Sequence, residues 1–204
     1  MVVFKEKRND LWCTMSKCFN FSTSPSKKYP LYVILGPSGS GKTTIMREIG
    51  LPELVSFTTR KMRNGEINGV DYHFLTKEDV EKRKEKGLLA EWNEYANHTY
   101  GITKEELSNR ASKGPSYWIA EIHGFRKMKE IYPNTIGIYI YTNQEQTLKQ
   151  LKQRGETNET IEVRMRENEE TSNWMDECDY IIYNHHNRLN NAVKLIKYIV
   201  AAKS

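Results

Sequence analysis

The sequence predicts an α/β fold in which a parallel β-sheet is flanked by helices. Short continuous apolar runs of strand length recur along the chain, and segments with helical periodicity lie between them. A glycine-rich turn joins the first such run, residues 31–35, directly to a predicted helix. Strands that alternate with helices are typical of parallel sheets. The 204 residues, of which 38% are hydrophobic and 28% charged, suffice for a core that needs no disulfide or metal.

The composition also limits the partners that we expect. The 31 Lys and Arg residues exceed the 26 Asp and Glu residues, for a net charge of +5, but the basic residues are interspersed with acidic ones. This pattern favours small phosphorylated ligands over a nucleic acid polymer. No apolar stretch approaches the roughly twenty residues that cross a bilayer, so we expect no membrane association. The sequence leaves a monomer and a homo-oligomer equally open.

Three cysteines, at positions 13, 18 and 178, are too few and too scattered for a disulfide framework or a four-ligand zinc site. They predict a reducing, cytoplasmic location. Residues 1–28 are predicted to be a flexible leader, since residues 19–26 are polar and turn-forming. A transit peptide is the alternative, but Glu6 and Asp10 disfavour it.

The elements follow in order from Tyr29. Residues 31–35 read as a strand buried on both faces, and Thr43–Ile49 as a helix that ends at Gly50. Further strands are predicted at residues 117–122, 136–141 and 180–183. Residues 56–110 interrupt the alternation and are predicted to be an insertion over the ligand side of the sheet. Helix caps are predicted at Thr103 with Glu106 and at Asn143 with Gln146. A last helix is predicted from the apolar residues that recur at helical spacing, which are Leu189, Val193, Ile196 and Val200.

The glycine-rich turn matches the pattern G-x-x-x-x-G-K-[ST] between a strand and a helix. Its glycines let successive main-chain N–H groups point at a phosphate, and the helix N-terminus adds a favourable dipole. Lys42 would bridge the β- and γ-phosphates of a nucleoside triphosphate, and Thr43 would donate its hydroxyl oxygen to Mg²⁺. The alternative is a glycine turn with an exposed lysine, which the flanking strand and helix disfavour. The residues of the motif are Gly36, Pro37, Ser38, Gly39, Ser40, Gly41, Lys42 and Thr43.

A second basic patch follows the motif. Arg60 and Arg63 lie three residues apart, with hydroxyl residues before them and Tyr72 after them. Two guanidinium groups could fix a second phosphate by bidentate contacts. A solvated basic turn is the alternative that the spacing alone does not remove.

These motifs together resemble guanylate kinase in order and spacing, from about Tyr29 to the C-terminal helix. The resemblance rests on residues 36–43, the run 58–74 (Thr-Thr-Arg-x-x-Arg-x-Gly-Glu-x-x-Gly-x-Asp-Tyr-x-Phe), Glu91-Trp92 and Tyr100-Gly101. It implies a P-loop NTPase core over residues 29–55 and 111–204 within a domain of residues 29–204. It further implies an NMP-binding subdomain of about residues 56–110 and a mobile lid of about residues 149–166.

The resemblance implies ATP, Mg²⁺ and GMP or dGMP as ligands, and a role for each matching residue. Lys42, Arg63, Arg154 and Arg164 would be catalytic, the last two as lid arginines that neutralise the transferring phosphoryl group. Thr44 and Asn184 would join the motif in the ATP site. A carboxylate that accepts from guanine N1–H and N2–H would select against adenine, which has no donor at N1. The GMP site would comprise Ser56, Arg60, Arg63, Tyr72, Glu91, Tyr100 and Glu121, the last on the strand of residues 118–122.

The sequence departs from the family pattern at several places. Ile102 replaces a Ser or Thr whose hydroxyl helps to hold guanine, and Ile119 replaces an acidic residue. Gln150 replaces a further lid arginine, and the first helix is shorter than usual. The departure at Ile102 leaves open a kinase for another deoxynucleotide, such as dTMP or dUMP. A non-catalytic phosphopeptide-binding module of the same fold is also open, but such modules generally lack an intact phosphate loop and lid.

Overall fold

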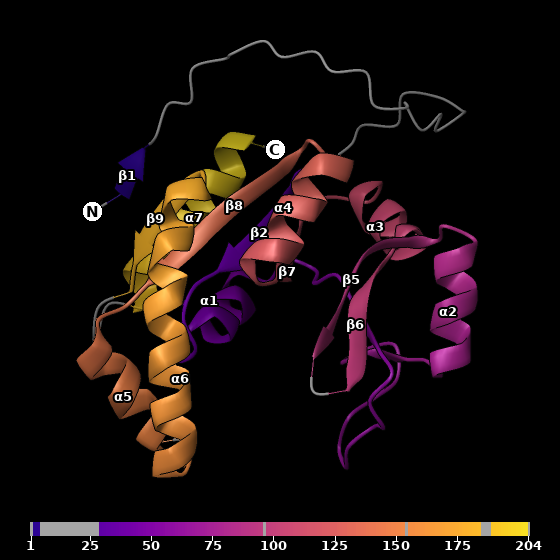
Figure 1. The fold of residues 1–204 in the computed structure, drawn as a ribbon. Helices are drawn as coiled ribbons and strands as arrows, with labels where there is room; N and C mark the ends of the chain where they lie inside the picture. Colours follow the sequence, from indigo (N-terminus) through magenta and orange to yellow (C-terminus); the bar gives the residue numbers. More distant parts are fainter. Residues whose placement is uncertain (1, 5–28, 96, 154, 185–188, 204) are drawn as a thin grey trace.

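The computed structural model describes residues 2–4, 29–95, 97–153, 155–184 and 189–203. Figure 1 shows a larger unit, in which helices cover both faces of one sheet, beside a smaller unit built around a second sheet. Within the described residues, no helix is long and apolar enough to span a bilayer. The α/β class predicted from the sequence is confirmed.

The large sheet has the strand order β1-β9-β8-β2-β7. Its parallel strands are β2 (Leu31–Leu35), β7 (Ser116–Ile119), β8 (Thr135–Tyr141) and β9 (Tyr180–Tyr183). All five residues of β2 are buried, as expected for a strand that helices cover on both faces. Strand β1 (Val2–Phe4) pairs antiparallel with β9 and was not predicted. Residues 5–28 of the predicted leader lie outside the described part of the chain.

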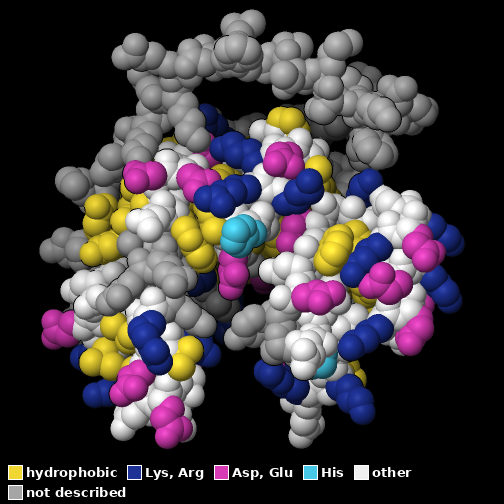
Figure 2. Space-filling view, viewed as in Figure 1, with side chains coloured by type: hydrophobic (Ala, Val, Ile, Leu, Met, Phe, Trp, Pro, Cys, Tyr) yellow, Lys and Arg dark blue, Asp and Glu magenta, His cyan; other side chains and the backbone are white. Residues whose placement is uncertain are grey.

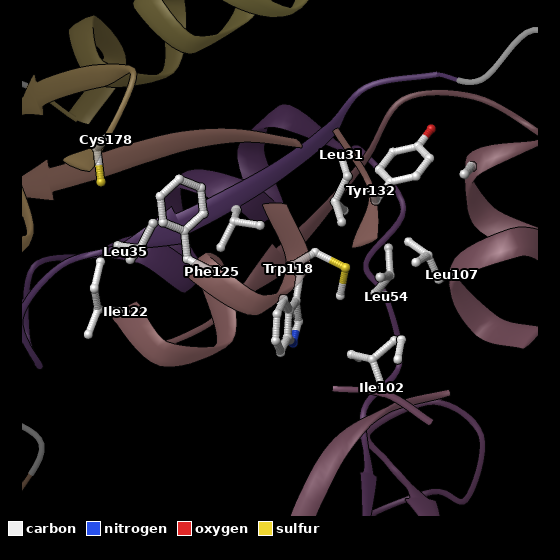
Figure 3. Packing of buried hydrophobic residues seen from close by; sticks show 14 of the residues in the cluster. Leu31, Leu35, Leu54, Ile102, Leu107, Trp118, Ile122, Phe125, Tyr132 and Cys178 are labelled. Carbon is white, nitrogen blue, oxygen red and sulfur yellow. The ribbon is translucent and has the colours of Figure 1, made fainter. Parts of the chain in front are cut away.

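Side chains of β2 alternate between two apolar layers because successive residues of a strand face opposite sides. Tyr32 and Ile34 pack in one layer with α1 (Lys42–Ile49) and α7 (Leu189–Lys203). Leu31, Val33 and Leu35 pack in the other layer with α4 (Ile122–Ile131), as Figure 3 shows for Leu31, Leu35, Ile122 and Phe125. Helices α5 (Gln144–Gln153) and α6 (Asn158–Thr171) and the 3₁₀ helix η1 (Ser172–Glu177) connect β8 to β9.

The small sheet has the order β4-β3-β6-β5 and is formed within the predicted insertion. Its strands are β3 (Phe57–Thr58), β4 (His73–Phe74), β5 (Leu89–Tyr95) and β6 (His98–Thr103), and its helices are α2 (Lys77–Glu85) and α3 (Lys104–Ala111). The smaller unit has a small core of its own, formed by Phe57, Val80 and Leu89. Ile102 instead packs in the cluster of the large unit with Leu54 and Trp118, so apolar contacts join the two units (Figure 3).

The predicted strand at residues 117–122 was wrong at its end. Strand β7 stops at Ile119, and Ile122 begins helix α4. Ile122 and Phe125 recur at helical spacing on the buried face of α4, and this periodicity outweighs the β-propensity of an isoleucine. Glu121 therefore lies at the N-cap of α4 and not on the strand.

Both predicted capping pairs are confirmed. The N–H of Glu106 donates to Thr103 Oγ1 at 3.1 Å, and the N–H of Gln146 donates to Asn143 Oδ1 at 2.8 Å. Such side-chain acceptors satisfy N–H groups that the first helical turn leaves unpaired. They fix where α3 begins after β6 and where α5 begins after β8.

Candidate active site

The predicted phosphate loop connects the buried strand β2 to helix α1. Its backbone requires glycine at both ends, since Gly36 has φ 133° and Gly41 has φ 89°. A Cβ atom at Gly36 would lie 2.3 Å from the carbonyl oxygen of Ile140, and one at Gly41 would lie 2.7 Å from Asn184 Nδ2. These positions combine positive φ with close approach of neighbouring groups, which only glycine accepts.

Lys42 lies at the start of α1 and folds back over the loop. Its Nζ donates to the carbonyl oxygens of Gly36 at 2.7 Å and Pro37 at 2.8 Å. Thr43 and Thr44 follow in the first turn and are exposed. The ammonium group is therefore held at the mouth of the loop, and the Thr43 hydroxyl is an oxygen donor of the hard type that Mg²⁺ accepts. Over the described part of the chain, no group of three or more His, Cys, Asp or Glu side chains could hold a metal ion.

Helix α6 approaches the phosphate loop with a basic side chain. Arg164 donates through one terminal nitrogen to the Ser38 hydroxyl at 2.5 Å, and its Nε lies 2.7 Å from Glu156 Oε2. Glu156 thus holds one side of the guanidinium group while the other side faces the loop. The predicted lid residue Arg154 lies outside the described residues.

Asn184 follows β9 and is buried against the same loop. Its main-chain N–H donates to the Tyr141 carbonyl at 2.8 Å, and its Nδ2 donates to the Ser40 carbonyl at 2.8 Å. The structure therefore brings Asn184 to the main chain of the loop. Its predicted place beside adenine stays a prediction.

On the smaller unit, Arg60 is held by a carboxylate. Its two terminal nitrogens donate to Glu66 Oε2 at 3.0 Å and Oε1 at 2.6 Å, a bidentate pair. Glu66 Oε2 also accepts the main-chain N–H of Arg63 at 2.7 Å. The hydrogen bond from Arg60, followed by that from Arg63, lowers the pKa of Glu66, and the pair raises the pKa of Arg60. Glu66 fixes the fork of Arg60 in one orientation.

Two of the predicted tyrosines surround Arg60. Its guanidinium carbon lies 5.5 Å from the ring centre of Tyr72, and the rings of Tyr72 and Tyr100 meet edge to face at 6.1 Å. Burial, and then the proximity of Tyr100, raises the pKa of Tyr72. The Tyr72 phenol thus stays a protonated donor beside a fixed cation, which suits the binding of a phosphate. The side chain of Arg63 is exposed on the same loop.

Glu91 lies in β5, directly opposite Ile102 of β6. Only 7% of the residue is exposed. Burial, and then the charge of Glu121, raises the pKa of Glu91 to about 7. Glu91 is therefore a buried strand residue and not a surface charge. The structure brings Glu91 and Glu121 close enough to interact, although Glu121 comes from a helix cap and not from the expected strand.

Ser56 and Ile102 lie beside Trp118 of β7 at the junction of the two units. The indole N–H of Trp118 donates to Ser56 Oγ at 3.2 Å. Ile102 is fully buried in the cluster that contains Trp118 (Figure 3). The side chain next to Glu91 on β6 therefore presents hydrocarbon and no hydroxyl.

The two groups of predicted residues lie on the two units, the phosphate loop on the larger one and the group around Arg60 on the smaller one. In the space-filling view, a hollow separates the lobe of α5 and α6 from the lobe of the small sheet, with Lys and Arg side chains on both (Figure 2). Sequence reasoning assigned no role to Glu66, Trp118 or Asn168. Glu66 could have been noticed because it lies three residues after Arg63, at the spacing of a turn. Asn168 could have been noticed because it lies one helical turn after Arg164.

Comparisons with known proteins agree with this architecture. The family model described as Guanylate kinase matches residues 28–203. The chain is 34% identical over 185 residues to a guanylate kinase of Thermotoga maritima, which covers 86% of this chain and 88% of the relative. It is also 34% identical over 188 residues to one of Onion yellows phytoplasma, with coverage of 87% and 88%.

A solved structure shares the fold at lower sequence similarity. The guanylate kinase of Anaplasma phagocytophilum superimposes with a TM-score of 0.65 at 21% identity, over 87% of this chain and 86% of that one. The match of the family model over most of the chain, and relatives of 34% identity, leave one conclusion: this chain belongs to the guanylate kinase family.

Proposed function

We propose that this chain is an ATP:GMP phosphotransferase, which transfers the γ-phosphoryl group of MgATP to GMP or dGMP to give ADP and GDP or dGDP. One observation supports the proposal: two groups of residues that suit phosphate binding, of different construction, lie on the two units of a chain of this family. The first is the phosphate loop with Lys42, and the second is Arg60, fixed by Glu66 beside Tyr72.

In the proposed ATP site, the residues of the phosphate loop hold the triphosphate through their main-chain N–H groups. Lys42 contacts the β- and γ-phosphates, and Thr43 contributes its hydroxyl oxygen to the Mg²⁺ of MgATP. That ion would neutralise charge between the phosphates. Arg164, already at the loop through Ser38, and Arg154 stabilise the charge that spreads over the transferring group.

In the proposed GMP site, Arg60, Arg63, Tyr72 and Tyr100 hold the monophosphate. Ser56, Glu91 and Glu121 would face the base. The acceptor oxygen is already anionic, so the reaction needs no general base, and positioning with charge neutralisation supplies the catalysis.

The proposal includes a movement of two parts of the chain. Residues of about 56–110 act as the NMP-binding subdomain and residues of about 149–166 as the lid, and both close over the hollow between the lobes. Closure would exclude water, which otherwise accepts the phosphoryl group in place of GMP. We also propose a cytoplasmic location, in keeping with the three scattered cysteines.

The test is the release of ADP from MgATP with each purified ribo- and deoxynucleoside monophosphate. We expect turnover with GMP or dGMP at least about a hundredfold above the others, which is about 2.7 kcal/mol of discrimination. Lack of turnover with every acceptor, together with tight phosphopeptide binding, would contradict the proposal and favour the non-catalytic module.

The second candidate is a kinase for dTMP or dUMP, because Ile102 places hydrocarbon opposite Glu91. A pyrimidine N3–H would satisfy the carboxylate as guanine N1–H does. Ile102→Thr introduces a hydroxyl at this position. Ile102→Val is the matched control, because the Val side chain has nearly the same shape as Thr but no hydroxyl. If guanine is the acceptor base, the Thr variant should raise the preference for GMP over dTMP about fivefold. An unchanged ratio in both variants would mean that position 102 does not contact the base.

A further inference from the structure

Helix α6 makes a second contact with the phosphate loop, besides that of Arg164. The main-chain N–H of Ser38 donates to Asn168 Oδ1 at 2.9 Å, and Asn168 Nδ2 lies 3.4 Å from the Ser38 carbonyl oxygen, to which it donates. A side-chain amide offers one acceptor and one donor in a plane. Asn168 therefore pairs with the main chain of one residue through both of its groups, as a neighbouring strand would.

Asn168 and Arg164 are four residues apart in α6 and so lie on the same face of the helix. Both contact Ser38, Asn168 through the main chain and Arg164 through the hydroxyl. In this structure, three contacts to a single loop residue set the distance and the rotation of this part of α6 relative to the loop.

Ser38, the residue that α6 contacts, lies in a part of the phosphate loop whose backbone is flanked by glycines. Ser38 lies between Gly36 and Gly39, both at positive φ, where the chain has more conformational freedom than elsewhere. Two residues further along the loop, the Ser40 carbonyl accepts a hydrogen bond from the buried side chain of Asn184. The loop is thus held by an asparagine from each of two elements that are distant in sequence.

We propose that Asn168 is a positioning residue for the phosphoryl transfer. It holds the Ser38 peptide in the orientation in which the loop binds the triphosphate, and it aligns the Arg164 guanidinium with that loop. Binding to a loop that is already ordered loses less conformational entropy, so the contact increases the affinity for ATP. This proposal rests on the proposed function, because it assigns ATP to the loop.

The first test compares Asn168→Ala with Asn191→Ala, which changes an exposed asparagine of α7. Calorimetry measures the Kd for ATP and for GMP separately. Asn168→Ala should weaken ATP binding about five- to tenfold, the value of one or two lost hydrogen bonds, and change GMP binding less than about twofold. The Asn191 variant should change neither Kd. Equal losses for both ligands, or no loss of ATP affinity, would overturn the proposal.

A second variant keeps the test independent of any general loss of packing. Asn168→Asp keeps an acceptor for the Ser38 N–H but adds a negative charge beside the loop. The loss of affinity should then increase from AMP to ADP to ATP and decrease at high salt, because the repulsion depends on ligand charge. A loss that is equal for the three nucleotides would show that position 168 does not face the phosphates.

Alignment of Arg164 is tested by a double-mutant cycle on kcat. If Asn168 acts through Arg164, the effect of Asn168→Ala on kcat should largely disappear in an Arg164→Ala background. Additive effects would overturn this part of the proposal. ATP binding by the wild-type enzyme distinguishes failure of the proposed function from failure of this inference. If the wild-type enzyme does not bind ATP, the proposed function is wrong. If it binds ATP and Asn168→Ala leaves that affinity unchanged, only the role of Asn168 is wrong.

Discussion

The two proposed anion sites of this protein are built from different parts of the chain. In the phosphate loop, the main chain of eight consecutive residues would do the binding, and the glycine positions are dictated by close contacts with Ile140 and Asn184. The proposed acceptor site is made of side chains from β6 and from the loop between β3 and β4, and its central Arg60 takes its orientation from Glu66. A main-chain site depends on local conformation, whereas a side-chain site depends on the partners that surround each group.

The phosphate loop binds mainly through its main chain in our proposal, and Lys42 is the one charged side chain of its motif. Lys42→Ala should lower kcat about a thousandfold, because it removes the cation that compensates charge at the transferring phosphoryl group. Steady-state ADP release measures this effect. Lys197→Ala, which changes an exposed lysine of α7, should keep normal turnover. Turnover of the Lys42 variant within tenfold of wild type would mean that the main-chain amides suffice without the ammonium group.

The buried carboxylate of the acceptor side should affect stability as well as binding. The pKa of Glu91 is raised to about 7 from 4.5, so the folded state binds this proton more tightly than the unfolded state. The contribution of Glu91 to the free energy of unfolding therefore becomes unfavourable as the pH rises from 4.5 through about 7. Glu91→Gln should increase the free energy of unfolding at pH 8 by up to about 3 kcal/mol, at about 1.4 kcal/mol per pKa unit, and give no gain at pH 4.

Urea unfolding at the two pH values measures this change, and Glu94→Gln, on the exposed part of β5, is the control. The KM for GMP of the wild-type enzyme should fall as pH rises from 6 to 8, because the base contact requires the carboxylate. A gain in stability that is the same at both pH values would contradict the raised pKa.

The acceptor site itself is tested at Arg63. Arg63→Ala should lower kcat/KM for GMP more than about a hundredfold, since it removes a charge-assisted contact to the monophosphate. Lys61→Ala removes an exposed cation of the same loop and should have little effect. Near-normal rates for the Arg63 variant would show that the monophosphate binds elsewhere.

The smallest effect should come from the residue that orients the acceptor site. Glu66→Gln keeps the shape of the side chain but weakens the pair with Arg60, so the KM for GMP should rise about tenfold with the KM for ATP unchanged. Glu85→Gln, at an exposed site in α2, is the control. If both KM values rise together, Glu66 supports the fold of the lobe and does not orient Arg60 specifically.

The sequence predicted best what depends on neighbouring residues. Strand β2, the glycine turn and α1 followed from a contiguous pattern, and the caps at Thr103 and Asn143 from a spacing of three. The end of β7 was wrong because the strand was extended to Ile122, although Ile122 and Phe125 are spaced as on the buried face of a helix.

Sequence by itself determined the main-chain phosphate loop and the α/β order of this protein, because each is a property of consecutive residues. Only the tertiary structure decided that Glu66 holds Arg60, that Glu91 is buried opposite Ile102, and that Asn168 reaches Ser38. The last of these contacts joins residues 130 positions apart. Orientation and pKa depend on which groups folding brings together, and no local pattern in the chain encodes that proximity.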